Sequence, residues 1–253
     1  MTKLKQLSLI IGCSLSMSAM AADFAFDRPG TSFSTGITPV GQLAWEQGLP
    51  SVQYTESSNR DIKQLRLNGD VLLRTGISEN TELQFGWEGP VWERTRFQNR
   101  TYEDDGLGDV TIGVKHYVDL NDEKLKMAVL AQALIATGND NFTNEDDIYT
   151  VASSVEYQYN DIVTTGIGMF YSVENSDWSV TAVPTIGYKI AGNLSGYSEA
   201  VFTKKESENR EYSLGSGLIY AMNDRAQLDA NIGVDLAGSG RSYKGGMGVS
   251  FLF

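Results

Sequence analysis

Hydrophobic and polar residues alternate in short runs along most of the chain after residue 41. The alternation is clearest over residues 227–236, where Leu, Ala, Ile, Val and Leu occupy every second position. Gln, Asp, Asn, Gly and Asp occupy the positions between them. Side chains of a strand point alternately to its two faces, so the pattern predicts a strand with one apolar and one polar face.

About twelve such segments follow one another without a convincing helical period. The predicted strands are 41–55, 65–74, 82–88, 109–118, 125–137, 151–159, 162–173, 179–190, 194–203, 212–220, 227–236 and 242–253. The first changes phase around residues 48–50, which predicts a β-bulge there because proline cannot donate to the ladder. Segment 125–137 is apolar on both faces, which leaves its register open.

The connections alternate in length, with longer polar loops such as 95–107, 138–148 and 204–210 after odd strands and shorter turns after even ones. Transmembrane barrels combine an even strand number with long outer loops and short periplasmic turns. A soluble β-sandwich also has alternating strands but does not predict this loop pattern. We therefore expect an all-β fold, a transmembrane up-and-down antiparallel β-barrel of about 12 strands over residues 41–253.

The N-terminus has the pattern of an export signal. Lys3 and Lys5 precede an apolar stretch that is too short to span a bilayer as a helix, and a small-x-small site ends at Ala21. We expect residues 1–21 to be a signal peptide for export. Together with the predicted barrel, this signal predicts that the protein is located in the outer membrane of a Gram-negative cell. A lipoprotein box ending at Cys13 is the competing interpretation, although it leaves very few apolar residues before the cut.

The last predicted strand carries Tyr243, Met247, Phe251 and Phe253 on one face and small or polar residues on the other. It resembles the closing strand of bacterial outer-membrane barrels, in which a terminal aromatic serves as an assembly signal. Phe253 is the candidate for that signal. The expected partners are therefore outer-membrane lipids and the barrel assembly machinery.

Charged residues on the polar faces are candidates for the barrel lumen, because Arg or Lys on the lipid face costs about 2–4 kcal/mol at the midplane. These lumen-facing candidates are Glu46, Arg66, Asp70, Arg74, Glu82, Glu88, Asp109, Lys115, Glu156, Lys189, Asp229, Asp235 and Lys244. Acids outnumber bases among them, which predicts a mild preference for cations. Twelve-stranded barrels lie between filled eight-stranded ones and wide porins, so both a narrow pore and an occluded lumen remain open.

Residues 22–40 precede the first strand and are rich in Gly, Ser and Thr. The segment is too polar to cross lipid. It either hangs in the periplasm or folds into the lumen as a plug, and we favour the plug. Arg28 would then find carboxylate partners on the barrel wall.

Composition argues against several other functions. The chain has 20 basic and 32 acidic residues and a net charge of −12, which disfavours nucleic-acid binding. His116 is the only histidine, it falls on the lipid face, and it lacks the His-x-Ser pattern of outer-membrane phospholipases. The acidic loop 140–147 could hold calcium through its oxygens, although solvated loop charge is the simpler explanation. We expect no enzyme activity, no cofactor and no metal.

Three stretches resemble a known family. They are Asp-Arg-Pro at 27–29 with Pro-Val-Gly-Gln-Leu at 39–43 and Glu46, Gly-Leu-Gly-Asp-Val-Thr-Ile-Gly-Val-Lys at 106–115, and Ala-Thr-Gly-Asn-Asp at 136–140. Together they resemble the outer-membrane family labelled putative MetA-pathway of phenol degradation. The chain departs from the family pattern in the third stretch, where Ile135-Ala136 replaces Leu-Pro and Asn139 precedes Asp140. The resemblance implies a barrel of about twelve strands and says little about the substrate.

These observations together favour a monomeric outer-membrane barrel that acts as a narrow channel or passive transporter for small solutes, with aromatic or hydrophobic compounds as candidates. A structural or adhesion-type barrel with a filled lumen is the first alternative. An outer-membrane lipid hydrolase is the second.

Overall fold

The structure is a computed structural model that describes residues 24–57, 62–139, 141–237 and 241–253. The expected signal peptide, 1–21, lies outside the described residues. The strands are β1 (Leu43–Ser57), β2 (Ile62–Asn68), β3 (Val71–Ser78), β4 (Thr81–Trp87), β5 (Pro90–Phe97), β6 (Arg100–Leu107), β7 (Val110–Val118), β8 (Leu125–Ile135), β9 (Ile148–Gln158), β10 (Val163–Glu174), β11 (Asp177–Ala191), β12 (Leu194–Lys205), β13 (Glu211–Asn223), β14 (Ala226–Ala237) and β15 (Arg241–Leu252). The described residues include no helix long and apolar enough to cross a membrane.

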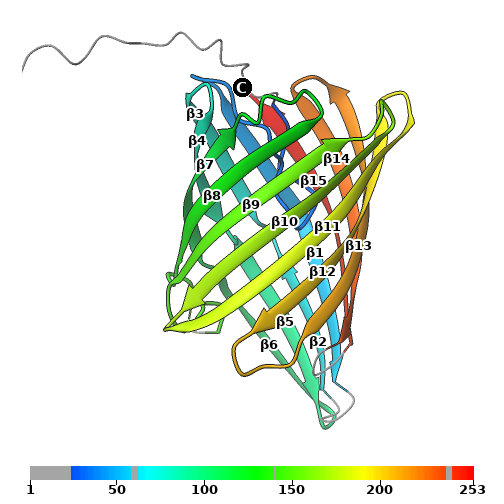
Figure 1. The fold of residues 1–253 in the computed structure, drawn as a ribbon. Coiled ribbons are helices and arrows are strands. Elements are labelled where there is room, and N and C mark those ends of the chain that lie inside the picture. The colour runs from blue at the N-terminus through cyan, green and yellow to red at the C-terminus, as the bar shows by residue number, and fades with distance from the viewer. Residues whose placement is uncertain (1–23, 58–61, 140, 238–240) are drawn as a thin grey trace, which may run out of the picture.

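The strands form one antiparallel sheet that closes on itself where β15 pairs with β1 (Figure 1). Three barrel strands are each split by a short break, at 69–70 between β2 and β3, at 88–89 between β4 and β5, and at 108–109 between β6 and β7. Each half of a split strand pairs with the corresponding half of its neighbour. The result is a closed 12-strand antiparallel barrel, which confirms the predicted fold class.

The predicted bulge in β1 is present, because its pairing with β15 shifts between Gly48 and Ser51. The shift moves inward-facing positions from even to odd numbers, so that Glu46 and Gln53 both point into the lumen. The bulge lies beside the break at 69–70, since the Gly48 amide donates to the Asp70 carbonyl at 2.9 Å. Irregularities in neighbouring strands therefore align across one wall of the barrel.

The outer face carries the apolar side chains, as the alternation predicts. Ile232 in β14 is 71% exposed, whereas Asp229 in the same strand is 4% exposed. Aromatic residues gather toward the two ends of this outer face, with Tyr149 and Trp178 toward one and Tyr157 and Phe253 toward the other. Such a band of exposed apolar residues with aromatic girdles is typical of a membrane-spanning barrel.

The predicted loop at 95–107 is wrong. This stretch contains the end of β5, a tight turn at Gln98 and Asn99 with positive φ, and the whole of β6. Figure 1 shows β2, β5 and β6 extending beyond the rest of the barrel at the end away from the C-terminus. This stretch of β5 and β6 lies past the main wall of the barrel and carries mostly polar residues on both faces, so it resembles a loop in sequence.

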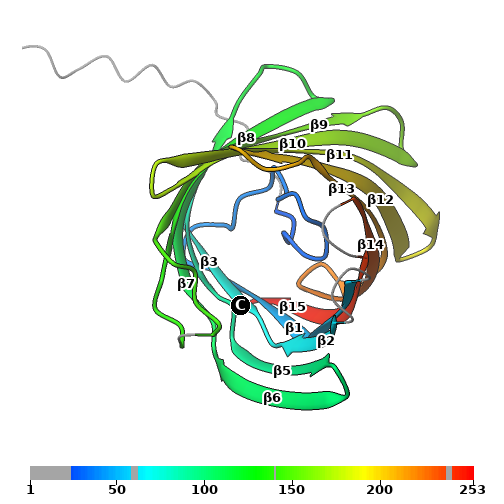
Figure 2. The same ribbon diagram turned by 90° about the horizontal axis from the view of Figure 1, so that it is seen from below.

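The N-terminal segment, residues 24–42, lies inside the barrel (Figure 2). Its Phe33 is buried in a small apolar cluster with Ala128 and Leu130 of β8 and Ala152 of β9. This contact also resolves the register of β8, since Ala128 and Leu130 face inward. The interior of the barrel is thus built around a part of the chain that is not a strand.

Candidate functional site

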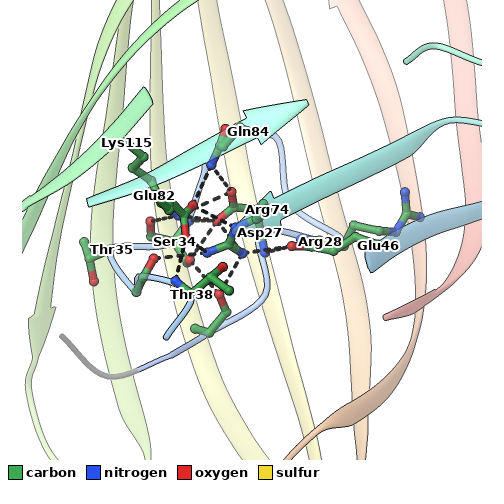
Figure 3. Close-up of polar contacts among 12 residues, drawn as sticks. Asp27, Arg28, Ser34, Thr35, Thr38, Glu46, Arg74, Glu82, Gln84 and Lys115 are labelled. Carbon is green, nitrogen blue, oxygen red and sulfur yellow. Dashed lines mark hydrogen bonds and ion pairs between the residues drawn. The ribbon is translucent and has the colours of Figure 1, made fainter. Parts of the chain in front are cut away.

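A buried ion cluster joins the N-terminal segment to one wall of the barrel (Figure 3). Arg74 of β3 lies at its centre, with Glu46 of β1 and Glu82 of β4 each 2.8 Å from its guanidinium. Asp27 of the N-terminal segment lies 3.4 Å from the same group. The Arg74, Glu46 and Glu82 side chains are fully buried, so the guanidinium is surrounded by carboxylates rather than by water.

Lys115 of β7 adds a second positive charge to this cluster. Its ammonium lies 3.0 Å from Asp27 and 3.0 Å from Glu82. The side-chain amide of Gln84 donates to both of these carboxylates, at 3.1 and 2.8 Å. Buried charges are tolerated when they are paired and hydrogen-bonded, and every member of this cluster meets that condition. The wall and the N-terminal segment are therefore held as one unit here.

Wall glutamates also bind backbone amides of the N-terminal segment. Glu46 accepts from the Arg28 amide at 2.7 Å, and Glu82 accepts from the Thr38 amide at 2.6 Å. Buried backbone donors need a partner, and a segment without regular secondary structure cannot supply its own. The two carboxylates therefore accept hydrogen bonds from backbone amides and also act as counter-charges for Arg74.

Carboxylates on the opposite wall of the barrel also accept hydrogen bonds from the N-terminal segment. Glu156 of β9 accepts from the Thr35 amide at 3.0 Å. Glu199 of β12 accepts from both the amide and the hydroxyl of Thr31, at 3.0 and 2.5 Å. Residues 24–42 are thus fastened to strands on both sides of the barrel.

Arg28 occupies the seam at which the barrel closes. Its guanidinium lies 2.8 Å from Asp70 and 3.3 Å from Asp229. Gly48 and Gly248 lie opposite each other in the β1–β15 ladder beside this group. A Cβ on Gly48 would lie 2.2 Å from the Asp70 carboxylate, and one on Gly248 would lie 2.4 Å from Nε of Arg28. Side chains at these two positions would displace Arg28 or its partner.

A second segment is fastened at the break between β6 and β7. The carboxylate of Asp109 accepts from the backbone amides of Gly138 and Asn144, both at 2.8 Å. These residues belong to the connection between β8 and β9. In the same connection Phe142 is buried, and the Arg66 guanidinium lies 5.8 Å from the centre of its ring. Asp109 thus fixes the connection rather than lining an open pore.

Two of the cavities formed by the described residues lie inside the barrel. One of about 210 Å³ lies between the N-terminal segment and strands β9 to β13. Its lining includes Phe26, Phe33, Glu156, Tyr197 and Glu199. The other cavity, of about 250 Å³, lies at the mouth of the barrel that is away from the C-terminus. The ion cluster packs against β1, β3, β4 and β7, so the first cavity follows the wall on the other side.

The sequence-predicted lumen residues fall into three groups. Glu46, Arg74, Glu82, Asp109, Lys115 and Asp229 are buried inside, together with the less buried Arg28, Arg66, Asp70, Glu88 and Glu156. Asp235 and Lys244 form a 3.1 Å ion pair beside the mouth cavity. Lys189 is exposed near the end of β11, on the same face of the strand as buried Val183. The sequence singled out Asp27 only as part of the Asp-Arg-Pro motif at 27–29, and neither Asp27 nor Glu199 was predicted as a lumen charge.

His116, the only histidine of the sequence, is exposed on the outer face of β7. Its Nδ1 lies 2.9 Å from the Thr81 hydroxyl. Among the described residues, no group of three or more His, Cys, Asp or Glu side chains is placed to hold a metal ion. Asp140 of the acidic loop lies outside them. Phe253 is 59% exposed on the outer face, and its backbone pairs with Leu43 across the seam.

The comparisons with known proteins agree with this architecture. The family model described as "Putative MetA-pathway of phenol degradation" matches residues 26–253. No curated protein matches the sequence. The COG4313 outer membrane channel from Pseudomonas putida F1 is similar in structure, with a TM-score of 0.67, 13% identity, and coverage of 89% of this chain and 99% of that one.

Two other solved structures are similar in fold. The KdgM porin in complex with disordered oligogalacturonate has a TM-score of 0.53 and 10% identity, and the match covers 79% of this chain and 98% of that one. The translocator domain of the autotransporter NalP from Neisseria meningitidis has a TM-score of 0.52 and 10% identity, with 89% and 90% covered. At these identities the likeness concerns the fold alone.

Proposed function

Because the chain belongs to the putative MetA-pathway of phenol degradation family, we propose that it is a monomeric outer-membrane channel for the passive movement of small solutes. Two proteins with this fold are described as an outer membrane channel and as a porin, which supports the proposal. The fold alone does not carry function, so the argument rests on the lumen.

The observation that carries the proposal is the space that remains beside the N-terminal segment. The buried ion cluster of Arg74 and Lys115 holds the segment against one wall, whereas a cavity of about 210 Å³ remains between the segment and the other wall, where hydrogen bonds to Glu156 and Glu199 also hold it. We infer that this segment is a plug that narrows the lumen. Solutes then pass along β9 to β13, beside Glu156 and Glu199.

The lining of that cavity suggests the class of solute. Phe26, Phe33 and Tyr197 provide aromatic surface, and Glu156 and Glu199 provide negative charge. Small aromatic compounds fit such a lining, and positively charged ones fit it best because carboxylates and aromatic faces both attract cations. Transient block of the channel current by benzylamine, and weaker block by benzoate, would support this assignment.

Single-channel recording in planar bilayers tests the proposal. We expect the barrel lacking residues 22–39 to conduct more than the full-length protein, because the deleted segment contributes one side of the passage. The matched control is Lys244→Gln, a change at the mouth that leaves the segment in place. Equal conductance of full-length and truncated barrels would contradict the plug.

A filled-lumen structural barrel is the second candidate, and the buried cluster around Arg74 favours it. Such a cluster stabilises a plug that never leaves. In that case the full-length barrel would not conduct and only the barrel lacking residues 22–39 would, and the surface loops would carry the function of the full-length protein. An outer-membrane lipid hydrolase has less support, because His116 is followed by Tyr117 and Val118 and so lacks the His-x-Ser pattern of outer-membrane phospholipases.

A further inference from the structure

The two cavities inside the barrel lie along one row of inward-facing positions. We call them the mouth cavity, which Gln53 and Lys244 help to line, and the inner cavity, which Glu199 helps to line. Direct pairings lead from one cavity to the other in the order Gln53 of β1, Lys244 of β15, Gly233 of β14, Gly215 of β13 and Glu199 of β12. Residues that pair directly in a ladder share a face of the sheet. Along this row, two glycines separate the two cavities.

Gly233 differs from inward glycines that make room for the N-terminal segment. At Gly76, an added Cβ would lie 2.1 Å from the carbonyl oxygen of Thr38 in that segment. The three heavy atoms nearest to a Cβ on Gly233 all belong to the barrel wall, at 3.3, 3.9 and 4.0 Å, and the closest is the Leu214 carbonyl oxygen. The missing side chain of Gly233 therefore leaves a space that the N-terminal segment does not fill.

The side chains on either side of the two glycines are held in place by other contacts. The Lys244 ammonium lies 3.1 Å from Asp235, which lines the mouth cavity, so the ion pair draws this side chain toward the mouth. Glu199 leans over Gly215, because a Cβ on Gly215 would lie 2.9 Å from Oε1 of Glu199. The same carboxylate accepts hydrogen bonds from the N-terminal segment. Gly215 therefore makes room for Glu199, whereas the space at Gly233 is left for a solute.

The charges on both sides of this space are mainly negative. The charged residues that line the mouth cavity are Glu211, Asp235 and Lys244, and those that line the inner cavity are Asp27, Arg28, Glu156 and Glu199. Acids outnumber bases in each set, and opposite charges attract more strongly where water is partly excluded. A solute with one ammonium group therefore meets carboxylates before and after it passes the glycines.

We propose that solutes move between the mouth cavity and the inner cavity across Gly233 and Gly215, and that the missing side chain at Gly233 sets the width of solute that can pass. The inference rests on the proposed channel function and specifies the route within it. The solutes that fit this route are small organic cations. A larger side chain at position 233 narrows the route without touching the N-terminal segment.

Single-channel recording of the full-length protein in planar bilayers tests the route. We expect Gly233→Leu to lower the conductance about twofold or more, because conduction depends on the width of the pore. Benzylamine should also cause fewer blocking events in this variant. Heat-shifted gel mobility shows that the variant has folded.

The matched control is Gly245→Leu on the outer face of the neighbouring strand. Gly245 pairs directly with Ile232, which is 71% exposed, and an added Cβ would lie 3.4 Å from the Asn231 carbonyl oxygen, much as at Gly233. This control should conduct like the unmodified protein. Equal conductance of Gly233→Leu and the unmodified protein would overturn the proposal.

A cysteine variant tests the route in a channel that has already folded. The only cysteine of the sequence, Cys13, lies in the expected signal peptide, so Gly233→Cys would carry the single thiol of the mature protein. The positively charged reagent 2-aminoethyl methanethiosulfonate, added to a conducting channel, should modify this thiol and lower the current. The control Gly245→Cys faces lipid and should keep its current. An unchanged current through Gly233→Cys after treatment would count against the route.

The recordings also separate this inference from the function on which it rests. Absence of current through the unmodified protein would overturn the channel function and the route together. Current through the unmodified protein that neither Gly233→Leu nor the thiol reagent reduces would overturn the route alone. A reduction at position 233 and none at position 245 would support both.

Discussion

Arg74 and Glu82 are diagonal neighbours on the paired strands β3 and β4, with Nε of Arg74 donating to Oε1 of Glu82 at 2.8 Å and both side chains fully buried. The same glutamate accepts from Thr38 of the N-terminal segment. One carboxylate therefore links β3, β4 and the segment that lies inside the barrel. Much of the interior depends on this pair.

Arg74→Met should destabilise the barrel by about 3–5 kcal/mol, because it leaves buried carboxylates without their main counter-charge. The control Arg94→Gln breaks an exposed ion pair with Glu103 and should cost about 0–1 kcal/mol. Urea unfolding in lipid vesicles measures both values. Similar stabilities of the two variants would mean that the buried cluster does not hold the barrel together.

The two faces of β14 provide a direct test of the barrel orientation. Ile232→Arg should cost about 2–4 kcal/mol if the side chain meets lipid near the midplane, whereas Asn231→Arg faces the lumen and should be tolerated. Folding yields in lipid vesicles compare the two substitutions. Comparable yields would contradict the assigned faces.

The closed hydrogen-bonded barrel should resist unfolding by detergent at room temperature. We expect boiled and unboiled samples to migrate differently on gels, and the protein to fractionate with outer membranes. Release by a carbonate or salt wash together with equal mobility would rule out the membrane barrel.

Phe253→Ser should lower the amount of assembled protein more than Leu252→Ser does. Phe253 is exposed on the outer face beside the seam, and Leu252 points to the other face. Immunoblots of isolated outer membranes, with and without heating, quantify the folded fraction. An equal or larger effect of Leu252→Ser would contradict the role of Phe253 in assembly.

If the lumen conducts, the acidic lining should favour cations. Glu156 and Glu199 lie in the cavity wall, and the wall carboxylates there outnumber nearby bases. Reversal potentials in a salt gradient give the sign of the preference, which should fade at high salt as the charges are screened. Glu199→Gln should reduce the preference. Anion selectivity of the unmodified channel would contradict this prediction.

The faces of the membrane-spanning strands could be predicted from sequence because lipid forces one side of each strand to be apolar. β14 shows this clearly, with Ile232 outside and Asp229 inside. The same argument fails at 95–107, where β5 and β6 extend past the main wall of the barrel and carry mostly polar residues on both faces. Alternation therefore reports contact with lipid rather than the presence of a strand.

The partners of the inward charges could not be predicted in the same way. The alternation placed Arg74 and Glu82 on an inner face, but nothing local indicates that Asp27 lies between Arg74 and Lys115. Glu199 was missed because residues 194–203 carry small residues on both faces, so their parity is hard to assign. Phe202 on the outer face was the available signal.

The position of Arg28 imposes an order on folding. Asp70 follows β2 and Asp229 lies in β14, so the two carboxylates are far apart along the chain and flank the β1–β15 seam. They come within reach of one guanidinium only when the first and last strands have paired. The N-terminal segment, although synthesised early, therefore reaches its final position inside the barrel last. A barrel stalled before closure would have this segment still loose, and protease sensitivity of residues 24–42 would report how far assembly had advanced.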